Sequence, residues 1–353
     1  MMHSPQTRAE YTLSLICLLL FLPLLSGCEM LGYYAQSING QLDLLQKRRP
    51  IESLLLDNAI DPELKQRLRR VVAIREFASQ QLALPDNDSY LSYAELQREA
   101  VVWSLVATPE FSVKPISWCY PVVGCAAYRG YFDKRDAEAH GEQLAAQGYD
   151  QVVNPVPAYS TLGWFDDPIT SSVIRWSEPR LAALIFHELA HQKLYVQGDS
   201  AFNEAFATQL ARIGVQAWLE QEAPEKLEQW HRQRSRSSQF TQLLLQSRAS
   251  LAVLYAEGLP ASQMRQRKQA LFDQLRRRYQ ALKAEWGGYS GFDHWFRRPL
   301  NNALLASLAT YESLVPGLEA LYRQQSGDLE RFYAACEALA ELPLEARHAR
   351  LRP

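Results

Sequence analysis

The sequence predicts an α+β fold that is mostly α-helical, with one small β-sheet. Three observations predict it. Residues typical of strands (Val, Trp and Tyr, bounded by Pro or Gly) are concentrated between residues 101 and 164. Segments before residue 98 and after residue 208 repeat apolar residues at helical spacing. Between them, residues 181–208 have the pattern of a helix, a turn and a second helix.

Length and charge exclude some classes of protein. The chain has 353 residues, of which 47% are hydrophobic, so it can bury a large core as one domain or two closely packed ones. The formal net charge of −2 gives no reason to expect a nucleic-acid partner. Basic residues do cluster at positions 265–278, but such a run indicates a solvated helix face.

Residues 1–27 have the pattern of a signal peptide. Arg8 supplies a positive charge, and an apolar run follows from Leu13 to Leu25. The run leads into Leu25-Ser26-Gly27-Cys28, which resembles a bacterial lipobox. Cleavage before Cys28 would leave that cysteine as a lipidated N-terminus; the alternative is an uncleaved signal anchor.

The predicted lipid anchor suggests a location. Glu29, rather than Asp, follows the cysteine. By resemblance to sorted lipoproteins, the chain therefore lacks the usual inner-membrane retention signal. We therefore expect the protein in the bacterial cell envelope, anchored to the membrane through the lipid on Cys28. The periplasmic face of the outer membrane is the expected side.

Cysteine usage agrees with export. Cys119 and Cys125 flank the turn-rich segment 120–124, so in an oxidising compartment they are predicted to form a small disulfide. The alternative is a pair of reduced core cysteines. Cys336 lies in a helical stretch, where it is expected to be a buried small apolar residue.

The mature chain divides into three predicted parts. Residues 28–98 form an N-terminal linker and helical part, in which Asp61-Pro62-Glu63 has the features of a helix start. Residues 99–220 form an α/β core that contains the metal motif described below. Residues 221–353 form a C-terminal helical part, with a loop at 287–291 and an interruption at Pro316-Gly317.

The strands are predicted in the central part. Residues 101–106, 126–132 and 152–156 are strand candidates, and a helix is expected from Asp133 to about Gln147. Pro155 and Pro157 remove two donors from the hydrogen-bond ladder. The third strand is therefore predicted to lie at the edge of the sheet, ahead of the helix at 181.

The strongest functional pattern is HELAH at residues 187–191. On a helix, His187 and His191 lie one turn apart on the same face and can hold one metal ion. Glu188 is placed to act as general base on the attacking water. Glu204, beyond a turn at 197–200, would complete a His₂Glu set for Zn²⁺.

Other interpretations of this pattern remain open. HExxH also occurs on amphipathic helices as two surface histidines, although apolar flanks such as Leu184 and Leu189 favour a buried helix. Asp199 in the turn and Glu220 further along are rival third ligands.

The stretch Asn203-Glu204-Ala205-Phe206-Ala207 closely resembles the N-E-G-F-A segment of gluzincin aminopeptidases, although the connector from His191 is shorter here. The resemblance implies a gluzincin-like zinc-helix core. It also implies that the edge strand before the HExxH helix pairs with substrate, with Leu162, Gly163 and Trp164 as contacts. The alternative is a merely protected edge.

More closely, the chain resembles a bacterial lipoprotein family labelled putative aminopeptidase, from about Tyr33 onward. The resemblance depends on YRGYF at 128–132, AYSTLGWFDDP at 158–168, the metal motif and LNNA at 300–303. It implies a zinc metallopeptidase acting on peptide substrates. A zinc endopeptidase and a non-catalytic zinc-binding lipoprotein are the alternatives.

Two roles are expected on the strength of these resemblances. Gluzincins take an oxyanion donor from their C-terminal helices, and Tyr311 is the preferred candidate here, ahead of His294. An aminopeptidase must also bind the free α-ammonium group of its substrate. Asp166 and Asp167, just before the HExxH helix, are the carboxylates placed to bind it, although they could equally mark a turn.

Overall fold

The computed structural model describes residues 32–120, 124–158, 161 and 165–352, in two compact units. In the first unit, which ends at Lys47, residues 32–46 are helical. The second unit, Arg48–Pro353, contains all other described elements. No helix in the described part of the chain is long and apolar enough to cross a membrane. The signal peptide 1–27 and Cys28 lie outside the described residues.

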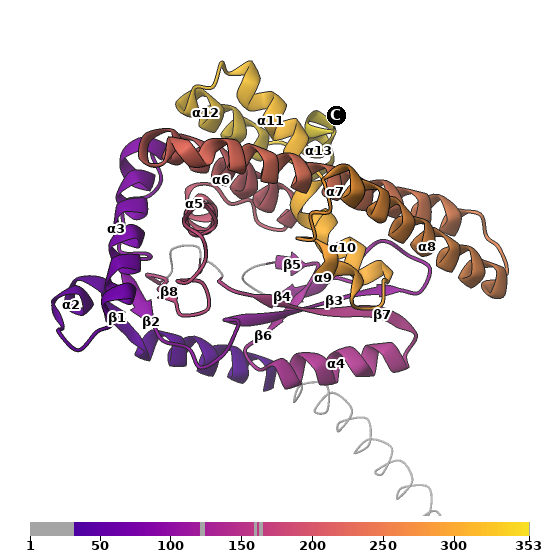
Figure 1. Cartoon of the computed structure of the whole chain (residues 1–353). Coiled ribbons are helices and arrows are strands. Elements are labelled where there is room, and N and C mark those ends of the chain that lie inside the picture. The colour runs from indigo at the N-terminus through magenta and orange to yellow at the C-terminus, as the bar shows by residue number, and fades with distance from the viewer. Residues whose placement is uncertain (1–31, 121–123, 159–160, 162–164, 353) are drawn as a thin grey trace, which may run out of the picture. The chain divides into compact units, whose positions relative to one another are not determined.

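Helices make up most of the second unit, and this confirms the prediction of a mostly α-helical α+β fold (Figure 1). They are α2 (Ile51–Leu56), α3 (Pro62–Leu82), α4 (Lys134–Ala146), α5 (Glu178–Lys193), α6 (Ser200–Glu222), the 3₁₀ turn η1 (Pro224–Lys226), α7 (Leu227–Ala256), α8 (Ala261–Glu285), α9 (Asp293–Phe296), α10 (Asn302–Glu312), α11 (Val315–Gln324), α12 (Leu329–Ala340) and α13 (Leu344–Leu351).

The described strands form three small sheets. The first has the order β1-β2-β8, the second β6-β3-β7, and the third is the hairpin β4-β5. Their bounds are β1 (Arg48–Pro50), β2 (Ser92–Ala94), β3 (Val102–Pro109), β4 (Trp118–Tyr120), β5 (Gly124–Ala126), β6 (Arg129–Tyr131), β7 (Tyr149–Val156) and β8 (Ile169–Thr170).

Strand β7 lies at the edge of its sheet, as its prolines predicted. It pairs antiparallel with β3 along its whole length, and Pro155 lies opposite Trp103. A second edge strand, β8, follows β7 and comes directly before α5; it pairs in parallel with β2. The sheet β6-β3-β7 lies between α4 and α10 (Figure 1).

Two predictions about strands were wrong. The single strand expected at 126–132 is divided between β5 and β6, because β5 pairs with β4 across the disulfide hairpin while β6 pairs with β3. The N-terminal part at 28–98 was predicted as a linker and helices without strands, yet it contributes β1 and β2. Strands of three residues are too short to show a period of two in the sequence.

The core of the larger unit is built around α5 and α6. Helix α3 is capped by Asp61, whose side chain accepts a hydrogen bond from the Glu63 N–H, and Pro62 is its first residue. Its apolar face packs in one cluster with α5 and α6, and the buried members include Leu68, Ile74, Ala78, Ile185, Phe186, Phe202 and Phe206. Figure 1 shows α5 end-on between α3 and α6.

Helix α10 connects the sheet to this helical core. Ala303 and Leu304 pack against Val106 and Val152 of the sheet. The Asn302 N–H donates to Asp150 at 2.9 Å, and the Asn302 side chain donates to the Glu110 carbonyl at 2.9 Å. The LNNA segment thus fastens α10 to the end of β3 and the start of β7.

Candidate metal centre

Helix α5 carries the two histidines of the motif. It begins after Ser177, and Pro179 lies in its first turn. Its first residue, Glu178, accepts hydrogen bonds from Trp218 at 3.0 Å and from the Arg70 guanidinium, which fixes the start of the helix. His187 and His191 lie one turn apart, and their Nε2 atoms are 3.2 Å from each other.

The turn between α5 and α6 is held by two side chains. Asp199 caps α6 by accepting the Phe202 N–H at 3.1 Å. Asn203 accepts the Val196 N–H and donates to the Val196 carbonyl, both at 2.8 Å. Both side chains are buried, so this short turn is rigidly defined and Glu204 follows directly in the first turns of α6.

Asp199, the rival third ligand, has another role in this structure. Its carboxylate accepts a hydrogen bond from buried Arg347 at 2.5 Å and pairs with His348 at 2.9 Å. Arg347 also donates to the carbonyls of Leu339, Ala340 and Leu342. Asp199 therefore ties α13 to the start of α6. Glu220, the other rival, is exposed on α6 and accepts a hydrogen bond from Gln216.

Among the described residues, His187, His191 and Glu204 form the group that can hold a metal ion. Glu204 Oε2 lies 3.2 Å from His187 Nε2 and 3.7 Å from His191 Nε2. Tetrahedral zinc with bonds of about 2.0–2.1 Å requires its donor atoms to be roughly 3.3–3.4 Å apart. The three observed separations of 3.2, 3.2 and 3.7 Å bracket this value, so the donor set fits a zinc ion.

The protonation states also suit a cation. Burial and, to a smaller extent, neighbouring His187 lower the pKa of His191, Glu204 partly opposes them, and the resulting pKa is about 4. Burial would raise the pKa of Glu204, but the two imidazoles outweigh it and the pKa is lowered overall. At neutral pH the group therefore offers a neutral imidazole from His191 and a carboxylate from Glu204, the forms that bind metal.

The centre is partly open to solvent. The side chain of His187 is 20% exposed, against 9% for His191 and 13% for Glu204. Glu188, the predicted general base and the residue after His187, is buried, with 6% of its surface exposed. An exposed side next to a buried carboxylate is expected of a site that admits a substrate, because a purely structural zinc site is closed by four protein ligands.

The two aspartates predicted to bind the substrate's ammonium group differ in environment. Asp166 is exposed, and its carbonyl accepts a hydrogen bond from Arg48 at 2.8 Å. Asp167 is buried, and its carboxylate accepts the Thr161 N–H at 2.8 Å and the Thr161 hydroxyl at 3.1 Å. Burial raises the pKa of Asp167 to about 6, although the Thr161 hydrogen bonds lower it. Leu162, Gly163 and Trp164 lie outside the described residues.

Within the described part of the structure, neither predicted oxyanion donor is found at the metal centre. Tyr311 belongs to α10, but its side chain lies outside the described part. His294 is exposed on α9, and its Nδ1 lies 3.0 Å from the Gly291 carbonyl. Helix α9 packs with α7 and α8, where Phe240 stacks on Phe292. His294 therefore belongs to a different cluster from the HExxH helix.

Two tyrosines near the site were missed by the sequence reasoning. Tyr195, four residues after His191, is 40% exposed. Burial of part of its side chain and the charge of Glu204 raise its pKa. Helical spacing from His191 could not have indicated it, because α5 ends at Lys193 and the chain is extended at Leu194. Tyr90, far away in the sequence, lies close enough to Glu188 for that charge to raise its pKa, although burial is the larger cause. No sequence signal indicated Tyr90.

The predicted disulfide is present. Cys119 and Cys125 lie opposite each other in the β4-β5 hairpin and are bonded. The hairpin rests against the turn between α5 and α6: a Cβ added to Gly124 would lie 3.6 Å from the Gly198 nitrogen. The hairpin therefore supports the turn that presents Glu204.

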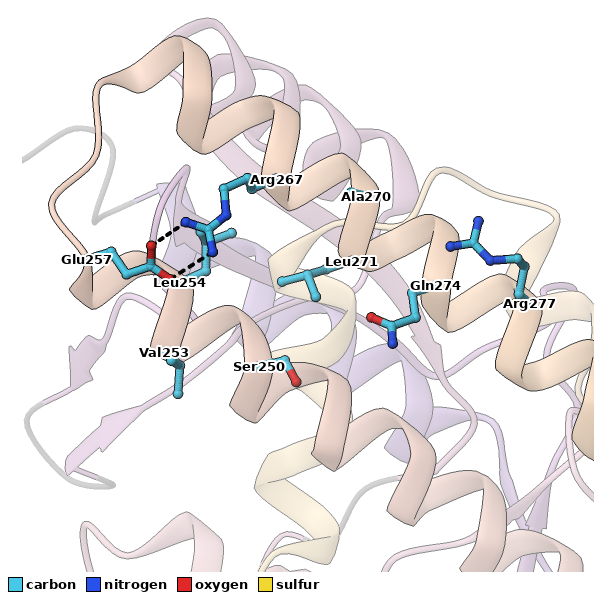
Figure 2. Close-up of a pocket in the computed structure, with 9 residues that line it drawn as sticks. All are labelled: Ser250, Val253, Leu254, Glu257, Arg267, Ala270, Leu271, Gln274 and Arg277. Atoms are coloured by element: carbon cyan, nitrogen blue, oxygen red, sulfur yellow. Dashed lines mark hydrogen bonds and ion pairs between the residues drawn. The ribbon is translucent and has the colours of Figure 1, made fainter.

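A separate hollow of about 510 Å³ lies between α7 and α8 (Figure 2). Glu257 and Arg267 form an ion pair at one end of it, and Leu254 and Leu271 are among its apolar lining residues. None of the metal-centre residues lines it. The single acidic residue that lines this hollow, Glu257, is already paired with Arg267. The hollow therefore has no group of side chains suited to catalysis.

These features define a mostly helical α+β protein with a candidate metal centre on two adjacent helices. The chain belongs to a family described as putative aminopeptidase, whose model matches residues 32–351. No curated protein and no solved structure matches it. Family membership supports a peptidase-like function at a coarse level.

Proposed function

We propose that this protein is a zinc metallopeptidase of gluzincin-like arrangement, acting as an aminopeptidase. The observation that carries the proposal is the triangle of donor atoms from His187, His191 and Glu204, with sides of 3.2, 3.2 and 3.7 Å. These three residues would hold the ion. When bound, zinc would polarise the scissile carbonyl and make water a better nucleophile near neutral pH.

Glu188 supplies the proton chemistry in this proposal. It follows His187 on α5 and is buried, so we expect its carboxylate next to the ligand triangle in a water-poor environment. Such a carboxylate can take a proton from the attacking water and return it to the leaving amine. A structural zinc site would not require this group, which distinguishes the proposal from a non-catalytic zinc-binding lipoprotein.

The test of the proposed function combines metal analysis with turnover. Purified protein should contain about one zinc per chain, the stoichiometry of a single catalytic site. It should cleave a library of free-amine peptides, lose activity with a chelator and regain it with zinc. Bound zinc without cleavage of any peptide would favour the non-catalytic alternative.

Asp167 is the better candidate for binding the α-ammonium group, because it is buried whereas Asp166 is exposed. A charge-assisted hydrogen bond is stronger where water is excluded. Asp167→Asn is therefore expected to raise KM for free-amine peptides about 10-fold or more, the scale of a lost bond to a charged group. Asp166→Asn is the matched control and should leave KM within about twofold.

The same assignment gives a pH dependence. The pKa of Asp167 is about 6, so its carboxylate is charged above that pH and becomes neutral below it. KM for free-amine peptides should therefore rise as the pH falls through about 6, and Asp167→Asn should remove this rise. N-acetylated peptides should not be cleaved. Internal cleavage of acetylated peptides at the rate of free ones would instead identify an endopeptidase.

We also propose that the protein is anchored to the bacterial envelope by a lipid on Cys28, on the basis of the sequence pattern at 25–28. Cys28→Ala should move the protein from the membrane fraction to the soluble periplasmic fraction, because the anchor can no longer be attached. Fractionation with detection of the full-length chain measures this. A Cys28→Ala protein that still sediments with membranes would favour an uncleaved signal anchor.

A further inference from the structure

Tyr90 has an unusual backbone conformation for its side chain. Its φ is +66°, and it is the only aromatic residue among the three non-glycine residues with positive φ in the described part of the chain. Bulky side chains rarely occupy this region, because the Cβ atom comes close to the backbone. Strained conformations of this kind are found where the surrounding structure enforces them, often at functional sites.

The Tyr90 side chain is also buried without satisfying its hydroxyl group. The residue is 1% exposed and packs in the core around α5 and α6. Its hydroxyl oxygen is fully buried and has no hydrogen-bond partner among the described residues. Most buried polar groups are hydrogen-bonded, so this hydroxyl costs stability in the resting structure and calls for another explanation.

A buried arginine holds the Tyr90 segment in place. Arg75, on α3, is 2% exposed and donates to the carbonyls of Ser89 at 3.0 Å and of Pro85 and Asn87 at 2.7 Å. The Tyr90 N–H donates to the Asp167 carbonyl at 2.6 Å. The strained conformation is therefore enforced from both sides.

The same segment is fastened to the HExxH helix. Asn87 donates to the Gln192 side chain at 2.7 Å, and Gln192 donates to the Ser89 hydroxyl at 3.2 Å. Gln192 lies four residues after Glu188, so the two share one face of α5. Residues 87–90 therefore run along the face of α5 that carries Glu188.

Two carboxylates act on the Tyr90 hydroxyl, and Glu188 is the better partner. Apart from burial, the charges of Glu188 and then Asp167 raise the pKa of Tyr90, so both lie nearby. Thr161 engages Oδ2 of Asp167, and that carboxylate is the proposed partner of the substrate's ammonium group, whereas the Gln192 hydrogen bonds place the Tyr90 segment along the face of α5 that carries Glu188. Catalytic hydrogen bonds often close only in the substrate complex, which accounts for an unsatisfied donor in the resting structure.

We propose that Tyr90 is a positioning residue for Glu188: its buried hydroxyl, aimed by the strained backbone and the Arg75 network, donates a hydrogen bond that orients the general base. This inference depends on the proposed peptidase function. Tyr90 itself is enclosed in the core and acts on the substrate only through Glu188.

Tyr90→Phe tests the inference, because it removes the hydroxyl and keeps the ring. It should lower kcat by about 10- to 100-fold, the scale for a group that supports a site residue. KM and zinc content should stay unchanged. The melting temperature should equal or exceed that of the wild type, since an unsatisfied buried hydroxyl is removed. In a Glu188→Gln background the same change should lower kcat no further, because no base remains to be oriented.

Tyr333→Phe is the matched control. Tyr333 is also buried, but its hydroxyl donates to the Leu82 carbonyl at 2.6 Å. Its loss should lower the melting temperature and leave kcat unchanged. A wild-type kcat in Tyr90→Phe would overturn this inference and leave the proposed function standing. The same holds if the loss of kcat is additive with that of Glu188→Gln and the melting temperature falls. If the wild-type protein cleaves no peptide, the proposed function fails and the inference with it.

Discussion

Glu188→Gln is expected to retain zinc and to lower kcat by about two to four orders of magnitude, the contribution of a positioned general base. The amide has the shape of the carboxylate but cannot accept the proton of the attacking water. Glu188 is not one of the three residues at the donor triangle, so the metal content should not change. Metal analysis and peptide turnover on the same preparation measure both effects.

Glu220→Gln is the control for this substitution. It makes the same chemical change at an exposed position on α6 and should leave turnover and zinc content unchanged. Undiminished turnover by Glu188→Gln would show that another group activates the water, and the assignment of the base would have to be abandoned.

Replacing Glu204 or either histidine should remove the metal and, with it, all activity. Glu204→Gln, His187→Ala and His191→Ala each leave two ligands, which cannot hold a catalytic zinc ion tightly. We expect each change to weaken zinc binding by at least about 10-fold. After dialysis, the protein should therefore keep only a small fraction of one zinc per chain. Elemental analysis of dialysed protein measures the occupancy.

Asp199→Asn separates the metal role from the structural one. Asp199 pairs with buried Arg347 and caps α6, so this change should lower the free energy of unfolding by about 3–5 kcal/mol, the usual cost of breaking a buried pair. Folded Asp199→Asn protein should still bind zinc. Full occupancy in Glu204→Gln together with loss of zinc in folded Asp199→Asn would transfer the ligand role to Asp199.

Local patterns predicted the elements that carry the candidate site. Spacing four residues apart on an apolar helix placed His187 and His191 together, and the turn at 197–200 directed α6 back along α5. Pro155 predicted the edge position of β7, and the close spacing of Cys119 and Cys125 predicted their disulfide. In each case a few neighbouring residues contain all the information, because the constraint acts within one or two turns of the chain.

Short elements could not be predicted in the same way. Strands β1 and β2 have three residues each, and β1 pairs with β2, some forty residues further along the chain. The division of residues 124–131 into β5 and β6 likewise depends on which partner strand each half meets. Pairing between distant segments leaves no periodic pattern in so few residues.

The sequence by itself determined the mostly helical fold class, the pair of helices and the three residues that can hold a metal ion, because apolar spacing and the HExxH pattern act locally. Only the tertiary structure decided what surrounds them. It engaged Asp199 with Arg347 from α13, and it buried Asp167 while leaving Asp166 exposed. It also gave Tyr90 a strained conformation and tied its segment to α5 through Gln192. These relations join residues up to about 150 positions apart, and they arise from burial and electrostatics that exist only once the chain is packed.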